Sequence, residues 1–191
     1  MPLGALKVAL LGAAGSAAGS PSMEIIATHS FNGSAYDFTF TNIPQDYADL
    51  RLVMRATKHP GTQFRGQMQV NASTATYSDR YSYMYGIYGN TSTSQSDSQN
   101  SYMAPQEIQV GGQPAYATVD FISYSNSNYN VQFSVWGQPG YGSNSMVGFS
   151  NGRAEGAGLN PLTSLRYGNL NSQGAMPSGT TLSLYGLGEA A

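Results

Sequence analysis

Residues 115–136 read AYATVDFISYSNSNYNVQFSVW, and this stretch gives the clearest indication of the fold. Apolar and polar residues alternate over Ala115–Tyr124 and again over Tyr129–Trp136, which is the period of a β-strand with one buried face. Ser125–Asn128 lies between the two segments and has the polar composition of a short turn. The stretch therefore predicts two antiparallel strands joined by a turn.

The same alternation extends outward from this stretch to both ends of the chain. In Asp49–Thr57, which reads DLRLVMRAT, Leu50 and Leu52 fall on the face opposite to Arg51. Further segments with the character of strands are Met23–Phe31, Ala35–Ile43, Gln63–Val70, Arg80–Tyr88, Glu107–Val110, Met146–Ser150, Leu162–Leu170 and Thr180–Leu187. No window longer than a turn has a helical period. Roughly eight to ten short strands predict an all-β domain over residues 23–191, an antiparallel β-sandwich like a jelly roll.

Particular residues predict the connections and faces of these strands. Asn32-Gly33 is the pair typical of a type I′ turn, and it predicts a hairpin between the first two segments. Gly89–Ser101, which reads GNTSTSQSDSQNS, predicts a long polar loop. The alternation in Gln63–Val70 places Gln67 and Gln69 on a polar face.

Residues 1–22 read MPLGALKVALLGAAGSAAGSPS and have two interpretations. One is a secretory signal, with Lys7 as the charged region before an apolar run and small residues. The other is an anchoring arm and linker that docks on a partner protein through Leu3, Leu6, Val8, Leu10 and Leu11. We favour the arm, because the charged region of a signal would contain a single lysine. Glycines interrupt the apolar run well before the roughly 20 residues of a transmembrane helix, so we expect no membrane insertion.

Charge is the unusual quantity in the composition. Only 9% of the residues are charged, against roughly a quarter in ordinary soluble domains, while 40% are hydrophobic. The surface must therefore be covered by neutral polar residues, which suits burial in an assembly or contact with neutral ligands such as glycans. The net charge of −2 argues against nucleic acid as a partner. We interpret the nearest basic cluster as the solvated faces of two strands; it consists of Arg51, Arg55, Lys58 and Arg65.

The sequence contains no enzyme signature that we can identify. Its two histidines, His29 and His59, have no partner at the spacing of a metal or catalytic motif. The absence of cysteine excludes disulfides, zinc–thiolate sites and cysteine nucleophiles. Asp46 and Asp49 flank a turn at Tyr47 and are interpreted as its caps. We therefore expect no catalytic residue, metal site or cofactor, although two carboxylates from distant strands could still meet in the fold.

The candidate functional residues are aromatic side chains suited to contact. If Val131, Phe133 and Val135 face the core, Trp136 points outward, where it can stack on a sugar or on another subunit. The alternative is that Trp136 covers the end of the sandwich under a loop. Tyrosines around the polar segment form a second candidate contact surface, with ordinary strand packing as the alternative. They are Tyr81, Tyr83, Tyr85, Tyr88 and Tyr102.

Two stretches resemble proteins of the tailed-bacteriophage virion. Phe40–Val53 reads FTNIPQDYADLRLV and contains Ile-Pro-x-x-Tyr followed by a strand that begins Asp-Leu. Pro177–Leu187 reads PSGTTLSLYGL and is similar to the Leu-Tyr-Gly ending of the same family. The opening Met-Pro-Leu-Gly also resembles the start of small virion proteins. The two motifs lie at both ends of the domain, in the order and at the separation that the family has, so the resemblance covers about residues 23–188.

The resemblance implies a non-enzymatic structural protein with a jelly-roll-like domain, located in the virion after assembly in the host cytoplasm. The first functional hypothesis is a tail-fibre or adsorption subunit, which docks through residues 1–22 and presents its loops to host surface glycans. The second is a capsid decoration or head-fibre protein that stabilises the shell, and a depolymerase is a distant third. A homotrimer is expected by analogy alone. Family members often carry Asn-Gly-Asp where Val70-Asn71-Ala72 keeps only the asparagine.

Overall fold

The computed structural model describes residues 23–58, 64–71, 77–87, 90–100, 109–110, 112–138, 146–154, 160–170 and 174–188. This part of the chain is all-β, and every pairing between its strands is antiparallel. The predicted arm, including Leu3, Leu6, Val8, Leu10 and Leu11, lies outside the described residues.

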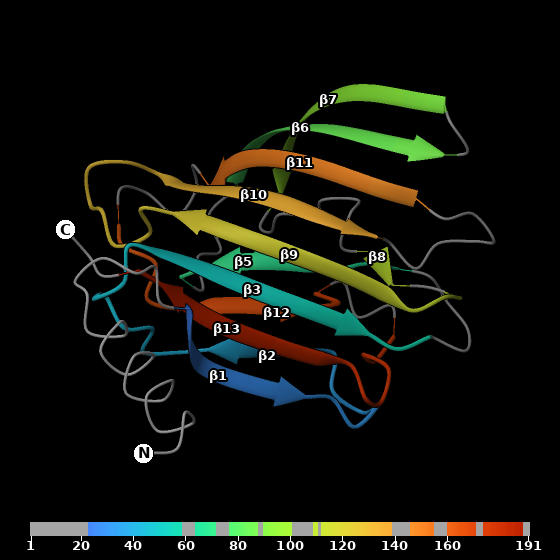
Figure 1. Cartoon of the computed structure of the whole chain (residues 1–191), viewed down its shortest axis with the longest axis horizontal. Helices are drawn as coiled ribbons and strands as arrows, with labels where there is room; N and C mark the ends of the chain where they lie inside the picture. Colours follow the sequence, from blue (N-terminus) through green and yellow to red (C-terminus); the bar gives the residue numbers. More distant parts are fainter. Residues whose placement is uncertain are drawn as a thin grey trace, which may run out of the picture.

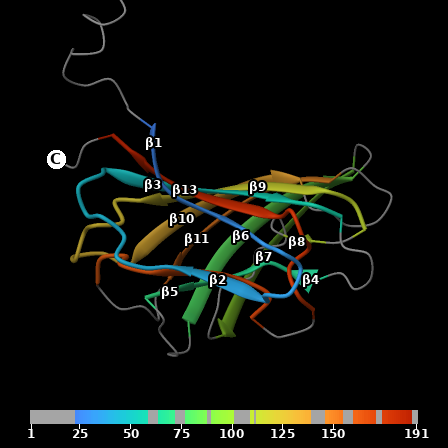
Figure 2. The same cartoon turned by 90° about the horizontal axis from the view of Figure 1, so that it is seen from below.

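The strands form a large sheet, a small sheet and a separate pair (Figures 1 and 2). The strands are β1 (Met23–Ser30), β2 (Asp37–Phe40), β3 (Asp49–Ala56), β4 (Phe64–Arg65), β5 (Gln67–Val70), β6 (Tyr77–Ile87), β7 (Asn90–Asn100), β8 (Gln109–Val110), β9 (Ala115–Ile122), β10 (Val131–Gln138), β11 (Met146–Ala154), β12 (Leu165–Gly168) and β13 (Thr181–Leu187). The large sheet has the order β1-β13-β3-β9-β10-β11-β6-β7, and the small sheet has the order β2-β12-β5. β4 pairs with β8.

The pairing of the strands is that of a jelly roll. The first strand, β1, pairs with the last, β13, and the second strand, β2, pairs with the last but one, β12. Further inward along the chain, β3 pairs with β9 and β4 pairs with β8. β13 also joins β3 in the large sheet, while β12 joins β5 in the small one. The predicted antiparallel sandwich is therefore confirmed, with the winding of a jelly roll.

Two hairpins are added to this jelly roll and widen its large sheet. β6 and β7 come between β5 and β8 in the chain, and β10 and β11 come between β9 and β12. β10 pairs with β9, and β11 pairs with β6, so the hairpins continue one sheet. Figure 1 shows β10, β11, β6 and β7 extending the sheet beyond β9.

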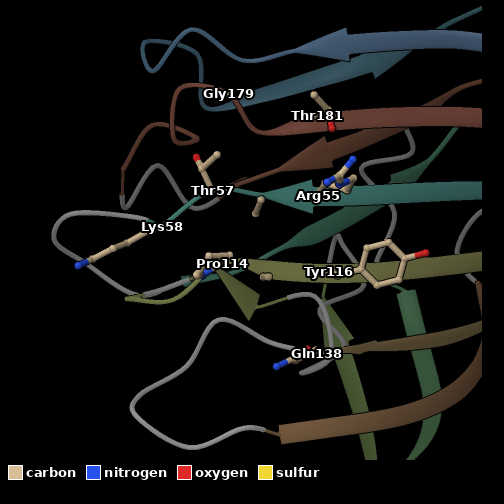
Figure 3. A pocket seen from close by; sticks show the side chains of 10 residues that line it. Arg55, Thr57, Lys58, Pro114, Tyr116, Gln138, Gly179 and Thr181 are labelled. Atoms are coloured by element: carbon tan, nitrogen blue, oxygen red, sulfur yellow. The ribbon is translucent and has the colours of Figure 1, made fainter.

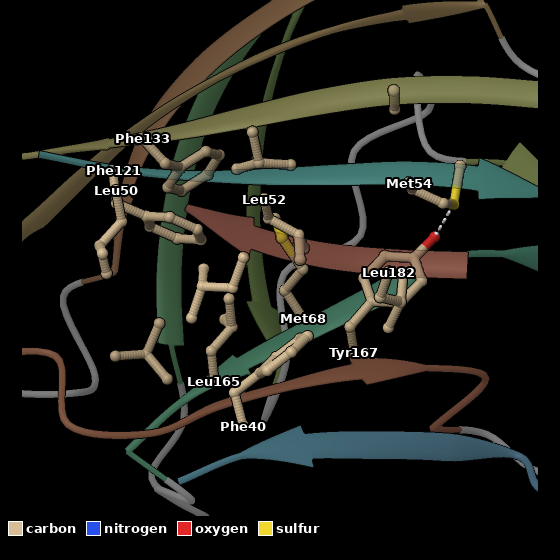
Figure 4. Packing of buried hydrophobic residues seen from close by; sticks show 14 of the residues in the cluster. Phe40, Leu50, Leu52, Met54, Met68, Phe121, Phe133, Leu165, Tyr167 and Leu182 are labelled. Carbon is tan, nitrogen blue, oxygen red and sulfur yellow. Dashed lines mark hydrogen bonds between the residues drawn. The ribbon is translucent and has the colours of Figure 1, made fainter. Parts of the chain in front are cut away.

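The core lies between the two sheets and follows from the alternation in the sequence. Residues at every second position of β3, β9 and β10 are buried, and the residues between them are more exposed. From the large sheet, Leu52 and Phe133 point toward Phe40 and Leu165 of the small one (Figure 4). The predicted core faces of these three strands are confirmed. A polar contact also joins the two sheets, because the buried Tyr167 hydroxyl of β12 donates a hydrogen bond to the sulfur of Met54 in β3.

We predict that Tyr167 makes the fold sensitive to alkaline pH. Burial raises the pKa of its hydroxyl above the ordinary value of 10.0, so the folded state holds the proton more tightly than the unfolded state. Its contribution to stability is therefore complete below about pH 10 and is lost above it, by about 1.4 kcal/mol per pH unit. Between about pH 8 and pH 11 the Tyr167→Phe variant should lose less free energy of unfolding than the wild-type chain, measured by urea denaturation. An unchanged pH dependence would contradict this role.

The two motifs that carry the family resemblance lie against each other in the fold. The ring of Tyr47 lies on the backbone of Gly186, where a Cβ would be 2.3 Å from ring atoms. The Tyr47 hydroxyl donates to a carboxylate oxygen of Glu24 at 3.0 Å, which raises the pKa of Tyr47. The Ala48 amide donates to the Leu187 carbonyl at 3.1 Å. These residues therefore form one structural unit at an end of the large sheet.

Asn71, which follows β5, fixes the end of that strand to the segment that precedes β12. Its backbone is left-handed, with φ of 55°. Its side-chain oxygen accepts from the amides of Thr163 and Ser164 at 2.8 and 3.2 Å. Its side-chain nitrogen donates to the Pro161 carbonyl at 2.8 Å. Asparagine suits this position because its short amide tolerates the left-handed region and satisfies several backbone groups at once.

Asn71→Ala should therefore lower the free energy of unfolding by about 1–2 kcal/mol, measured by urea denaturation. The variant loses the side-chain hydrogen bonds and places a Cβ in a left-handed conformation without compensation. Asn71→Gly is the matched variant, because it loses the same bonds but accepts the backbone geometry. It should cost less than alanine; equal stability of all three proteins would contradict the assignment.

The predicted hairpin at Asn32-Gly33 is wrong. β1 and β2 lie in different sheets, so the turn carries the chain from one layer to the other. The Asn32 side-chain oxygen accepts from the Ser34 amide at 3.0 Å, and Gly33 has φ of 91°. Asn32 thus forms an Asx-type turn in place of a two-residue hairpin. The sequence pair indicated a turn correctly, but the more distant pairing with β13 determines where β1 lies.

Three smaller predictions are also wrong. The polar segment predicted as a loop is largely β7, which pairs with β6 along its length. β7 lies at the edge of the large sheet. Its backbone pairing with β6 is sufficient to form the strand, although its sequence has no apolar face. Gln67 and Gln69 are buried, with 5% and 8% exposure, because both faces of β5 are covered. Asp49 does not cap its own turn; its carboxylate accepts from the Ser123 amide after β9 at 2.8 Å.

Candidate functional site

The outer face of the large sheet is the surface of the jelly roll that collects exposed apolar side chains. We define it as the side chains of β1, β13, β3, β9, β10 and β11 that point away from the core. Partners across adjacent strands point to the same side, so the register identifies its members. Its exposed large apolar residues are Met23, Ile25, Tyr116, Ile122, Trp136 and Phe149. Patches of this kind commonly mark interaction sites.

Trp136 lies near the middle of this face. The predicted outward orientation is confirmed, since Val135 is buried and 53% of Trp136 is exposed. Its partner on β11 is Phe149, with 41% exposure, and its partner on β9 is Thr118. The register extends the row to Val53 on β3. Trp136 and Phe149 are thus neighbouring exposed aromatic side chains, which we call the aromatic platform, and the Thr118 hydroxyl lies in the same row and donates to the Trp136 carbonyl at 3.4 Å.

The neighbouring row of the outer face carries a neutralised ion pair. The Arg51 guanidinium donates to both carboxylate oxygens of Asp120, at 2.6 and 2.9 Å. The hydrogen bond to Asp120 raises the pKa of Arg51 and exceeds the opposing effect of burial. Both side chains are about one-third exposed, so the pair contributes about 0–1 kcal/mol to stability. The ion pair therefore neutralises the charge of Arg51 on this face.

A pocket of about 660 Å³ opens at one end of β3 and β9 (Figure 3). The register aligns Thr181, Arg55 and Tyr116 across three neighbouring strands, and Gln138 of β10 is the other partner of Tyr116. The rest of the lining comes from residues at or next to the ends of these strands, namely Ala56, Thr57, Lys58, Pro114, Ala115 and Gly179. Gln138 lies two residues after Trp136 on the same face of β10, so the pocket and the aromatic platform share one surface.

The remaining candidates from the sequence are distributed differently. Tyr81, Tyr83 and Tyr85 lie in β6, which pairs with β11 on one side and with β7 on the other in the large sheet. Tyr88 and Tyr102 lie outside the described residues, as does His59. The ring of His29 stacks on Phe38 with the ring centroids 3.8 Å apart. This contact gives His29 a packing role.

Sequence reasoning missed Phe149, Tyr116 and the pocket. Phe149 lies within the predicted strand Met146–Ser150, but one sequence does not show which strand pairs with it. Tyr116 could have been found, since it alternates with the small buried residues Ala115 and Ala117. The pocket combines residues of β3, β9, β10 and β13, and only the fold brings them together.

Within the described ranges, no group of three or more histidine or acidic side chains is arranged to hold a metal ion. The same ranges contain no helix of the length and apolarity that a membrane span requires. Comparisons with protein-family models, with curated proteins and with solved structures find no match to this chain.

Proposed function

We propose that the chain is a non-enzymatic structural protein of a tailed-bacteriophage virion. In this proposal it is a tail-fibre or adsorption subunit that docks through residues 1–22, assembles as a homotrimer and presents its jelly roll to host surface glycans. The contact surface is the outer face of the large sheet around Trp136. The chain needs no cofactor for this role.

The observation that carries the glycan contact is the pair of exposed rings at Trp136 and Phe149. A sugar ring presents an apolar C–H face and a polar hydroxyl edge. Aromatic side chains cover the first, while the hydroxyl of Thr118 and the amide of Gln138 lie beside them for the second. Leaving two large aromatic rings in water gains nothing for the fold, since their burial would be favourable. Their exposure therefore supports a binding role.

Two further observations support the virion part of the proposal. The charge content of 9% leaves a neutral surface that resists association poorly, as suits a protein that functions inside an assembly. The jelly roll is a fold shared by viral capsid domains and lectins, which is support by analogy. The Ile-Pro-x-x-Tyr and Leu-Tyr-Gly motifs lie together around Tyr47 and Gly186, as expected if they were kept for one structural reason.

The proposal is tested in two steps on the phage whose genome encodes the chain. Mass spectrometry of purified virions should detect the protein, and its absence would contradict a structural role. The purified full chain should then bind the surface polysaccharide of the host and compete with phage adsorption. Detection in virions without any binding would remove the adsorption role and leave a structural one.

A second role, capsid decoration, is favoured by a separate feature of the outer face. Met23 and Ile25 are both more than half exposed on β1, at the edge of the large sheet. Apolar residues on an edge strand favour contact with another protein. Copy number separates the roles, since decoration requires hundreds of copies per virion and a tail appendage a few dozen or fewer.

A further inference from the structure

We infer that the pocket at Arg55 binds the carboxylate of an acidic sugar, so that the glycan recognised by the outer face is an acidic one. This inference rests on the proposed function and names the class of glycan. It is carried by the charge, the hydrogen-bonding groups and the position of the pocket.

The guanidinium of Arg55 lacks the ion pair that neutralises other arginines of the described residues. Two other arginines of the described residues each form a two-point ion pair, Arg51 with Asp120 and Arg166 with Asp37. Arg55 lies on the same face of β3 as Arg51, but the residue opposite it on β9 is Tyr116, where Arg51 has Asp120. Among the residues that the structure describes, no carboxylate lies within ion-pair distance of Arg55.

The groups that surround Arg55 in the pocket match a carboxylate ligand. Among the described residues, the pocket lining contains two cations, Arg55 and Lys58, and no carboxylate. Hydrogen-bond donors are available from the Tyr116 hydroxyl, the Gln138 amide and the Thr181 hydroxyl. Figure 3 shows Arg55 between Thr181 and Tyr116, while the Lys58 side chain points away from these three residues. A planar guanidinium among neutral donors matches a carboxylate, which accepts two parallel hydrogen bonds.

The sugar that carries the carboxylate has further contact surfaces beside Arg55. The ring of Tyr116 is partly exposed beside Arg55 and offers an apolar surface to the sugar that carries the carboxylate. Arg55 and Trp136 are two strands and one row apart, which places their Cα atoms about 12 Å from each other. One oligosaccharide can therefore place a carboxylate at Arg55 and a neighbouring sugar on Trp136. The pocket and the platform then act as two subsites of one surface.

The test measures binding of the full chain by titration calorimetry to an oligosaccharide that alternates glucuronic acid with glucose. The same oligosaccharide with its carboxyl groups reduced to alcohols is the neutral ligand. A third ligand carries a phosphate monoester in place of each carboxylate. The variants are Arg55→Gln and Arg153→Gln, where Arg153 is exposed on β11 away from the pocket and controls for the loss of one positive charge.

We expect the wild-type chain to bind the acidic oligosaccharide about tenfold or more tightly than the neutral one. Arg55→Gln should remove this preference and keep the affinity for the neutral ligand, while Arg153→Gln should keep the preference. Equal wild-type affinity for the acidic and neutral forms would overturn the inference and leave the proposed function intact. Tighter Arg55-dependent binding of the phosphate form would overturn the assignment to a carboxylate. If neither the acidic nor the neutral oligosaccharide binds, the inference fails, and binding of the host polysaccharide decides the proposed function separately.

Discussion

Gly186→Ala should lower the free energy of unfolding by about 2–4 kcal/mol, because the added methyl group has no room. A Cβ on Gly186 would lie 2.3 Å from ring atoms of Tyr47, which is far inside van der Waals contact. The ring cannot move away freely, since its hydroxyl donates to Glu24 and the Ala48 amide next to it is bonded to Leu187. For a domain of this size, the loss corresponds to a fall in melting temperature of about 6–12 °C.

The chain offers a matched control for this substitution. Gly112→Ala adds the same methyl group at a glycine where, apart from its chain neighbours, no atom of the described residues lies within 4 Å of the new Cβ, so it should leave stability within about 0.5 kcal/mol. The cause is tested by the pair with Tyr47→Ala, which removes the ring. In that background Gly186→Ala should cost little further stability. A Gly186→Ala protein as stable as the Gly112→Ala protein would show that the two motifs do not depend on each other.

Trp136→Ala should lower the affinity for the host glycan by about 30-fold or more, as removal of a central aromatic anchor does in binding surfaces. The indole supplies the largest exposed aromatic area on the outer face, and its loss leaves Phe149 alone on the platform. Because 53% of Trp136 is exposed, the fold should lose no more than about 1 kcal/mol. Calorimetric titration gives the affinity, and urea unfolding gives the stability.

Ile122→Ala is the control on the same face. Ile122 is exposed to 47%, similar to Trp136, but it pairs with Gln132 toward the opposite end of β10 from the pocket. Its removal should change the affinity by less than about twofold. If Ile122→Ala weakened binding as much as Trp136→Ala, the ligand would lie elsewhere on the sheet. Full affinity in Trp136→Ala would remove the platform from the binding site.

The sequence predicted those strands in which one face is buried against the core. β3, β9 and β10 alternate between buried and more exposed residues because each lies in a sheet with one covered side. The same alternation predicts the outward orientation of Trp136, since its neighbour Val135 belongs to the buried set. A period of two in the sequence is therefore sufficient when burial is one-sided.

The prediction failed where long-range pairing decides the structure. β1 forms no hairpin with β2, because pairing between β1 and β13 joins segments from opposite ends of the chain. β7 needs only the backbone of β6, so its polar sequence carried no strand signal. The anion pocket depends on which residue stands opposite Arg55, namely Tyr116 and not an acid. Such pairs follow from register, which one sequence does not reveal.

A glycan that binds on the outer face at Trp136, as we propose, would contact a direct spectroscopic reporter. Trp136 is the only tryptophan of the protein, so its fluorescence reports this surface without any substitution. Titration of the full chain with host surface polysaccharide should shift the emission to shorter wavelength and protect the indole from acrylamide quenching, with one saturating curve. Polysaccharide binding, detected by calorimetry, that left both the emission and the quenching unchanged would contradict the claim.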